Sequence, residues 1–584
     1  MSIVKILIVT DNQGGFQRST NNSHKFHVGE FVKVLSDTDW QGFDIEIVKA
    51  HRSADPSPGT PAATHPIAAD LYNFRFNDAS LNGFDMAFFF SIASKATDPV
   101  SSDTDRQNEA AAVARFMEAG KGYFAAGDHE DLGASINQHI PRIRSMRRWA
   151  HPGTGPHGGP VAPSGVLADR HDTLQAGSDS GTSGGSSFPF QFNDQSDDLP
   201  QTIAVRSYNI LHNRWFSSSL PHPLLCSPMG RINVLPDHMH EGWCEVPSDL
   251  TRDENLPGRA GKKEYPLDSV GVQVEPEVIA DATVLAHATL NQEFAGTSFE
   301  ISPATSNKSF GVIAAYDGHR ASIGRAVVDA TWHHFVNINV IGTSASFSGL
   351  NPNKVKGFYN GPGDTPVPAY QKIMHYYRNL VYWLIPANRG HLIFIDQLSA
   401  AMKLNPRWEQ FAGSQYFGDS LRKRWLWEII GFAQLAEEYF KATRGNCYKF
   451  HILPIYLYPI WKFDPRIWEE LAPEIAPWHP TAQVEARKQE VLEPWKQSLM
   501  PDSKLRMNIM LGTLMMAVHD SVGVHEKVTE KHAKVVQQRF FEMLPRHLEM
   551  AAEELESGIK ATKRLSADFK KLAEAASSVK LTAR

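Results

Sequence analysis

Cysteines and long apolar runs are scarce in this sequence, and their scarcity excludes several classes of protein. Only three cysteines, Cys226, Cys244 and Cys447, occur among 584 residues, and their wide spacing predicts neither a zinc cluster nor a disulfide framework. The most apolar helical window, residues 509–518, is too short to cross a membrane. Residues 3–9 are apolar but too few for a secretory signal.

An excess of charge of one sign is also missing. The formal net charge is −6 at pH 7, so no strong field attracts the chain to nucleic acid or to a membrane surface. Unpaired thiols and the lack of a signal segment favour a reducing compartment. We therefore expect a cytoplasmic protein that binds neither nucleic acid nor membrane.

What is present in the first 140 residues is an alternation of short apolar runs with amphipathic segments. The runs predict strands and the segments between them predict helices, one of them ending at Gly120. This alternation favours an α/β fold with a doubly wound, mostly parallel sheet, whose ligands bind beyond the carboxyl ends of the strands. The strands are expected at residues 3–10, 43–48, 84–92 and 122–126, and the helices at residues 26–35 and 103–119.

The rest of the chain divides into two parts that differ in composition and in hydrophobic periodicity. Residues 151–200 are rich in Gly, Pro and Ser and indicate an insertion, after which strand-like runs resume. From residue 366 onward helical periodicity dominates. We predict an α/β domain over residues 1–345 and a mainly α-helical domain over residues 366–584.

The strand at residues 122–126 leads into a sharp turn with unusual chemistry. Gly127 permits the reversal, and a helix is expected to start at Glu130. Strand, tight turn and helix together form a nucleophile elbow, which lifts one side chain above the sheet. That side chain is His129, flanked by Asp128 and Glu130, where such elbows normally carry Ser or Cys.

Three histidine-bearing stretches, residues 128–131, 235–242 and 329–335, could share a metal such as zinc. A catalytic zinc needs three N or O ligands and one open position, and His-x-His in an extended segment directs both rings to one side. Alternatively, His-x-His is a common accident, and a histidine pair after a strand can simply bond to backbone. The proposed metal ligands are His129, His238, His240 and His334.

Each stretch also offers groups for proton transfer. Glu130 or Glu241 could accept the proton of a metal-bound water, and Asp11, Asp128 and Asp237 could orient the ligands. The proposed catalytic residues are His129, Glu130, Glu241 and His333.

Other chemistries are less favoured by the residues. Ser/His/Asp catalysis needs a serine exposed at a turn, which the elbow lacks, and Cys226 and Cys244 have no strand–turn–helix context. Residues 145–149 mix Arg with Trp and are expected to form a solvated or partner-facing surface.

Three segments together resemble the class I glutamine amidotransferase-like superfamily, and within it the trehalose-utilisation (ThuA-like) branch. They are the opening strand at residues 3–10, Gly-Asp-His-Glu at 127–130, and Gly-Arg-Ala-Val-Val-Asp-Ala-Thr-Trp-His-His at 324–334. The resemblance covers residues 1–345 and implies a flavodoxin-like sheet. It puts His129 where the superfamily has its catalytic cysteine, and His333 or His334 where it has the partner histidine. Without that cysteine, glutamine hydrolysis through a thioester is not expected.

We predict from these features a hydrolase-like enzyme that acts on a small polar substrate through a histidine- and carboxylate-lined pocket, with a divalent metal as a possible cofactor. A second hypothesis is a non-catalytic sensor or scaffold whose helical region binds a protein partner. A third, which rests on the resemblance to the trehalose-utilisation branch, is a carbohydrate-handling protein.

Overall fold

The structure is a computed structural model. It describes residues 2–149 with gaps at 12–13, 19–23, 25, 41–42, 54–66, 94–97 and 128–132, and residues 201–284 with gaps at 214–215, 237–242 and 269–270. It further describes residues 308–341, 358, 367–404, 426–443, 503–522 and parts of 535–556. The insertion predicted at residues 151–200 therefore lies outside the described residues.

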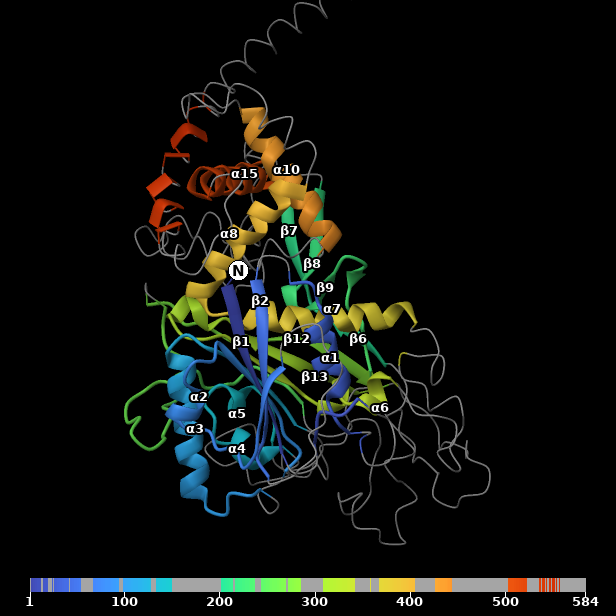
Figure 1. The fold of residues 1–584 in the computed structure, drawn as a ribbon, viewed down its shortest axis with the longest axis vertical. Coiled ribbons are helices and arrows are strands. Elements are labelled where there is room, and N and C mark those ends of the chain that lie inside the picture. Colours follow the sequence, from blue (N-terminus) through green and yellow to red (C-terminus); the bar gives the residue numbers. More distant parts are fainter. Residues whose placement is uncertain are drawn as a thin grey trace, which may run out of the picture.

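A ten-stranded mixed sheet forms the centre of the described structure, in the order β11-β6-β12-β13-β14-β5-β4-β1-β2-β3 (Figure 1). The six strands from β14 to β3 run parallel, and the remaining four are antiparallel. The α/β class is thus confirmed, with a mixed sheet that is parallel from β14 to β3, as the first part of the sequence predicts. The parallel strands are β1 (Ser2–Thr10), β2 (Phe43–His51), β3 (Ile67–Leu71), β4 (Met86–Phe90), β5 (Gly122–Ala126) and β14 (Ala326–Asp329). The antiparallel strands are β6 (Gln201–Val205), β11 (Val234–Leu235), β12 (Glu277–Val284) and β13 (Lys308–Tyr316).

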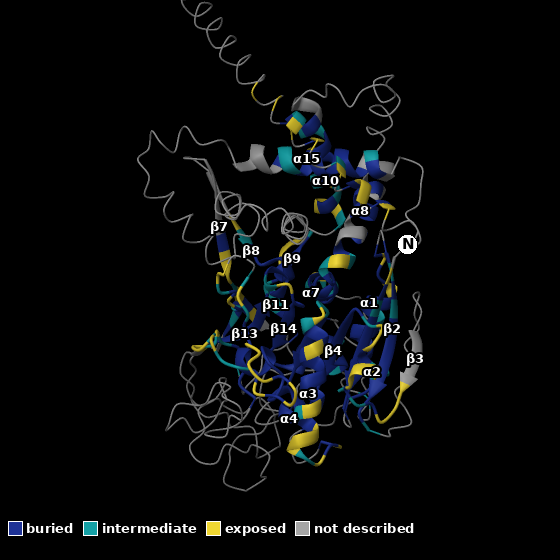
Figure 2. Ribbon diagram, turned by 90° about the vertical axis from the view of Figure 1, so that its left-hand side faces the viewer, coloured by how far each residue is buried: buried dark blue, intermediate teal, exposed yellow. Residues whose placement is uncertain are grey.

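The central strands are apolar on both faces because helices cover both. In β4, Phe88 and Phe90 pack against Phe31 of α1 (Gly29–Asp37), whereas Phe89 meets Phe76 on the opposite face. Figure 2 shows these strands in the colour of buried residues. A continuous apolar run is what a strand buried on both faces requires.

Helix α3 (Asp103–Glu118), which the sequence predicts as a helix, covers the face opposite α1. The Ser102 side chain caps its first turn by accepting a hydrogen bond from the Asp105 backbone N–H. Gly120, at a φ of +84°, follows its end. The short helices in this half are α2 (Asp78–Leu81), α4 (Ala134–Asn137) and α5 (Ile143–Met146). The residue at which the sequence predicts a helix start, Glu130, lies outside the described residues; the described helix α4 begins only at Ala134, after Gly133 in the left-handed conformation.

Helix α7 (Pro368–Leu384), the first of the helical sequence, packs directly on the sheet. Its Tyr377 hydroxyl donates to the His334 carbonyl at 2.5 Å, and the Arg325 guanidinium lies 3.8 Å from the centre of its Trp383 ring. Its last residue, Leu384, has its carbonyl 2.2 Å from where a Cβ on Gly122 of β5 would be. Only glycine therefore permits this approach of helix to strand.

Helices α8 (Ala387–Leu404), α10 (Leu426–Thr443) and α15 (Ser503–Val522) pack on one another. In both views they lie beyond the end of the sheet at which β1 begins, away from the carboxyl ends of the parallel strands (Figure 1 and Figure 2). None of the described helices is long and apolar enough to cross a membrane.

The remaining described elements are small. They are the hairpin β7 (Ser207–Asn213) and β8 (Phe216–Pro221), the pair β9 (Cys226–Ser227) and β10 (Gly230–Arg231), helix α6 (Asn337–Val340), and the 3-10 turns η3 (Pro223–Leu225), η4 (Gly318–Ala321) and η5 (Trp332–His334).

Two expectations drawn from the sequence are wrong. Residues 145–149 are buried rather than solvated: Arg147 donates to the Ala330 carbonyl at 2.8 Å, and Arg148 stacks 4.4 Å from the Trp243 ring centre. Carbonyl acceptors and an aromatic face can take a guanidinium into the interior. Cys226 is disulfide-bonded, because wide spacing in sequence does not prevent proximity in space.

Gly512 and Gly431 test the packing of α15 against α10. A Cβ on Gly512 would lie 1.9 Å from the Ile429 carbonyl oxygen, whereas one on Gly431 would meet nothing within 4 Å. We expect Gly512→Ala to lower the free energy of unfolding by about 1–3 kcal/mol through overpacking. Gly431→Ala should leave it unchanged or raise it slightly, because alanine favours a helix. Urea denaturation measures both, and equal effects would contradict this packing.

Glu277 of β12 predicts a pH dependence of stability. Its side chain is 17% exposed and accepts a hydrogen bond from the Tyr208 hydroxyl. Burial raises its pKa from 4.5 to about 8, so between these values the folded state binds more protons than the unfolded state, and this contribution to stability falls as pH rises. Glu277→Gln should therefore gain stability relative to the wild type between pH 5 and pH 8.5 in thermal unfolding. Parallel pH profiles for the two proteins would contradict this.

Candidate functional site

The parallel strands all end at one edge of the sheet, and the winding reverses between β1 and β4. After β1 the chain builds β2 and β3 on one side, and then crosses to build β4 and β5 on the other. Ligands of open α/β sheets bind in the crevice at such a reversal, beyond the carboxyl ends of the strands. The residues that follow β1, β4, β5 and β14 therefore define the candidate site.

Asp11, directly after β1, holds the loop that follows β4. One oxygen of its buried carboxylate accepts hydrogen bonds from the Ser91 hydroxyl at 3.0 Å and from the backbone N–H groups of Ile92 and Ala93, each at 2.5 Å. A carboxylate that accepts several donors fixes the backbone on which they lie. Asp11 thus spans the crevice and shapes it by fixing the loop that follows β4.

Two glycines close the turn that follows β5. The chain leaves the described residues after Gly127 and returns at Gly133, which has a φ of +87°. A Cβ on Gly133 would lie 2.6 Å from the Gly127 Cα and 2.6 Å from the Ser91 carbonyl oxygen. Glycine is thus required at Gly133 both for the φ value and for the close approach. The loop that contains Asp128, His129 and Glu130 begins and ends at one point of the edge.

The turn is joined to the end of β14, its neighbour in the sheet. Asp329, the last residue of β14, is paired in register with Ala126 of β5. Beyond them the Trp332 backbone N–H donates to the Gly127 carbonyl at 2.6 Å. The first and third histidine stretches therefore start from adjacent strands, as the sequence analysis requires for a shared site.

Asp329, His334 and Tyr376 form a buried hydrogen-bonded chain at this point. One Asp329 carboxylate oxygen lies 2.7 Å from His334 Nδ1, and the other accepts from the Tyr376 hydroxyl at 2.7 Å. The Thr331 backbone N–H donates to the first oxygen at 3.2 Å. Because an ionised carboxylate only accepts, His334 Nδ1 carries the proton and Nε2 is the basic nitrogen. His334 Nε2 has no hydrogen-bond partner among the described residues.

The ring of His333 forms a hydrogen bond with a different residue. Its Nδ1 lies 3.1 Å from the Asn339 side-chain oxygen in α6, and its backbone N–H donates to the Thr331 hydroxyl at 3.1 Å. The rings of His333 and His334 thus bond to separate groups. The carboxylate that orients His334 resembles the partner that orients a metal-binding or proton-accepting histidine.

The other proposed residues lie outside the described residues. Within the described part of the chain, no group of three or more His, Cys, Asp or Glu side chains could hold a metal ion. The second histidine stretch leaves the described chain after Pro236, following the edge strand β11, and returns at Trp243, beside β13. The proposed residues that are not described are Asp128, His129, Glu130, Asp237, His238, His240 and Glu241.

Cys244 lies close to Asp329 but is not suited to act as a nucleophile. Its thiol is buried and donates to the Val328 carbonyl at 3.6 Å. Burial raises the pKa of the Cys244 thiol well above its ordinary range, and the protonated thiol is a poor nucleophile. This agrees with the structural role expected from its sequence context.

Two members of the hydrogen-bonded chain were not among the candidates from the sequence. Asp329 ends the apolar run of β14, five residues before His334. A side chain at the end of a strand can contact the loop that follows, so this position could have been identified from the sequence. Tyr376 gives no such signal, because it comes from α7, 47 residues further along the chain. Burial and the neighbouring Asp329 carboxylate raise the pKa of its hydroxyl, so it stays a proton donor.

Comparison with known proteins adds no relative. No protein-family model, curated protein or solved structure matches the chain. The resemblance to the amidotransferase-like superfamily therefore depends on the motif residues alone.

Asp11 gives the test of how the crevice is built. Asp11→Ala leaves the donors of Ser91, Ile92 and Ala93 without their acceptor, and we expect a loss of about 2–4 kcal/mol in the free energy of unfolding. Asp78→Ala removes an exposed carboxylate paired with Arg115 and should cost less than about 1 kcal/mol. Urea denaturation compares them, and hydrogen exchange at residues 91–93 should accelerate only in Asp11→Ala. Similar losses in the two variants would contradict the role given to Asp11.

Proposed function

We propose that the protein is a hydrolase-like enzyme with an amidotransferase-like, flavodoxin-like sheet, and that it acts on a small polar substrate at the carboxyl edge around β5 and β14. The single observation that carries this proposal is the Asp329–His334 pair, with its 2.7 Å contact at Nδ1 and a basic Nε2. An imidazole whose Nδ1 proton is held by a carboxylate leaves Nε2 as the atom that can accept a proton from water.

In this proposal each member of the chain has a separate task. His334 Nε2 accepts the proton of the attacking water, and the Asp329 carboxylate stabilises the imidazolium that results. The Tyr376 hydroxyl holds the second Asp329 oxygen, and this fixes the direction of the carboxylate. In the proposal His129 and Glu130 also act at this site, which is supported by the hydrogen bond from the Trp332 N–H to the carbonyl of Gly127, the residue before their loop.

A divalent metal such as zinc is part of the proposal. When such a metal is bound, His334 Nε2 would be a ligand instead of a base, together with His129, His238 and His240, and the metal would lower the pKa of a bound water towards 7. Glu130 or Glu241 would then accept the proton, with His333, Asp128 and Asp237 as supporting groups. Because the elbow has no cysteine, the proposal does not include hydrolysis through a thioester intermediate.

Activity assays with matched histidine variants test the proposal. The full chain, with and without added zinc, is assayed against chromogenic esters, amides, phosphate esters and glycosides, and its metal content is measured. His334→Gln should lower kcat for any accepted substrate by about 10²–10⁴-fold, and Asp329→Asn should lower it through the loss of the imidazolium's counter-charge.

A second histidine–carboxylate pair provides the control. His547 is buried and lies 2.9 Å from Asp520 of α15, so His547→Gln removes a comparable pair from the helical part and should leave kcat unchanged. Circular dichroism confirms that each variant is folded. No turnover of the panel by the wild type, or full activity in a folded His334→Gln protein, would contradict the catalytic proposal and favour the non-catalytic scaffold.

A further inference from the structure

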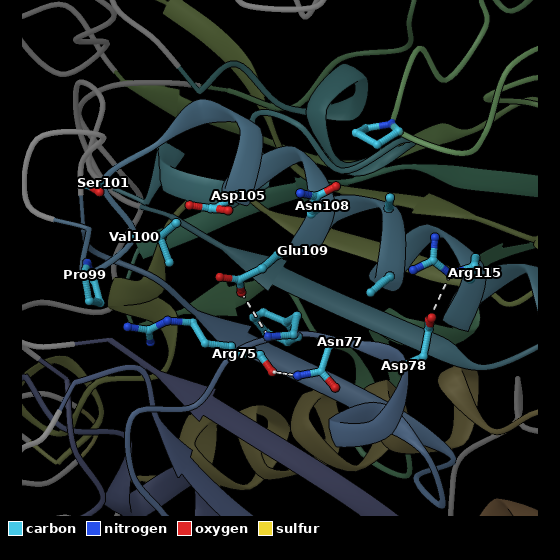
Figure 3. A pocket seen from close by; sticks show the side chains of 14 residues that line it. Arg75, Asn77, Asp78, Pro99, Val100, Ser101, Asp105, Asn108, Glu109 and Arg115 are labelled. Atoms are coloured by element: carbon cyan, nitrogen blue, oxygen red, sulfur yellow. Dashed lines mark hydrogen bonds and ion pairs between the residues drawn. The ribbon is translucent and has the colours of Figure 1, made fainter.

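A groove between α3 and the segment that precedes α2 is separate from the candidate site. It has a volume of about 540 Å³ and is lined mainly by polar and charged side chains. Figure 3 shows Arg75 and Asn77 on one wall and Asp105, Asn108 and Glu109 of α3 on the other. We call it the α3 groove.

The carboxylates that line the α3 groove are already engaged. Glu109 accepts from Arg52 at 2.6 Å and from the Phe76 backbone N–H at 2.9 Å. Asp78 is paired with Arg115 at 2.9 Å, and Asp105 accepts from the Ser102 hydroxyl at 2.6 Å.

Arg75 differs from these groups because it forms no ion pair with a carboxylate among the described residues. Its Nη1 donates to the carbonyls of Arg52 at 2.6 Å and Phe74 at 2.8 Å. No described residue accepts a hydrogen bond from its Nε or Nη2. Because Nη1 donates to two carbonyls, the orientation of the guanidinium is fixed. The N–H groups of Nε and Nη2 form its remaining edge, and such an edge can bind two anionic oxygens side by side.

The ion pairs below the groove balance without Arg75. Arg52 lies 3.1 Å from Asp98 and is also paired with Glu109, while Arg106 lies 3.7 Å from Asp98. The two buried guanidinium groups are thus balanced by the two buried carboxylates of Asp98 and Glu109. Burial and the positive charge of Arg52 lower the pKa of the Arg75 guanidinium, and a bound anion would offset both effects.

We propose that the α3 groove binds a small anionic ligand, and that the Nε–Nη2 edge of Arg75 grips its carboxylate or phosphate group in a bidentate pair. The groove walls hold the rest of the ligand: Pro99 and Pro257 supply apolar surface, and Asn77 and Asn108 supply amide groups. This binding does not depend on the histidine pair at β14.

Calorimetric titration of the full chain tests the proposal. Sodium phosphate and sodium succinate are the probes, each compared with sodium chloride at matched ionic strength. We expect at least one of the two probes to bind the wild type, and Arg75→Gln to weaken its binding by about tenfold or more. Arg75→Lys keeps the charge but loses the planar fork, so its affinity should also fall. The probe that binds more tightly tells whether the groove prefers phosphate or carboxylate.

Two further variants keep the test independent of folding. Ser101 is exposed and lies at the same end of the groove as Arg75 (Figure 3), so Ser101→Asp should weaken binding by repulsion without disturbing the core. Arg115→Gln removes a cation that Asp78 already neutralises at the other end, and should leave binding unchanged. The proposal is overturned if neither probe binds, if Arg75→Lys binds like the wild type, or if Arg115→Gln weakens binding as much as Arg75→Gln. His334→Gln should bind the probe normally, which separates this proposal from the hydrolase.

Discussion

The buried Asp329 carboxylate joins three parts of the chain, and the candidate site depends on that junction. It terminates β14, accepts from His334 in the turn that follows, and accepts from Tyr376 of α7. A buried carboxylate is costly unless donors surround it, so the strand, the turn and the helix must come together for the charge to be tolerated. The first helix of the helical sequence is therefore part of the site.

Asp11 has the corresponding role at the other end of the crevice. It holds the loop after β4 through three donors, while Gly127 and Gly133 close the turn after β5. The carboxyl edge is thus built by two buried carboxylates on either side of a pair of glycines. This construction fixes where the loop that contains His129 leaves and rejoins the sheet, because Gly127 accepts a hydrogen bond from the Trp332 N–H and Gly133 donates one to the Ala93 carbonyl.

Apolar runs and glycines made the sheet predictable, whereas partners distant in sequence did not. Strands β1, β2, β4 and β5 and helix α3 follow from periodicity and end signals, because burial on both faces requires continuous apolar residues. Strand β3 is not predicted, because it follows a stretch of sequence rich in turn-forming residues. The polarity of Arg147 and Arg148 predicts exposure, but both are buried. A backbone carbonyl accepts a hydrogen bond from Arg147, and a Trp ring stacks on Arg148. His333 and His334 could be named as candidates, but the carboxylate and the tyrosine that orient His334 depend on tertiary structure.

Nitrogen-15 NMR of the histidine-labelled protein tests most directly whether Asp329 prepares His334 as a base, with His334→Gln identifying the signal. The account predicts that neutral His334 carries its proton on Nδ1 and has an unprotonated Nε2, because the Asp329 oxygen 2.7 Å from Nδ1 can only accept. A His334 signal with the proton on Nε2 would contradict the account.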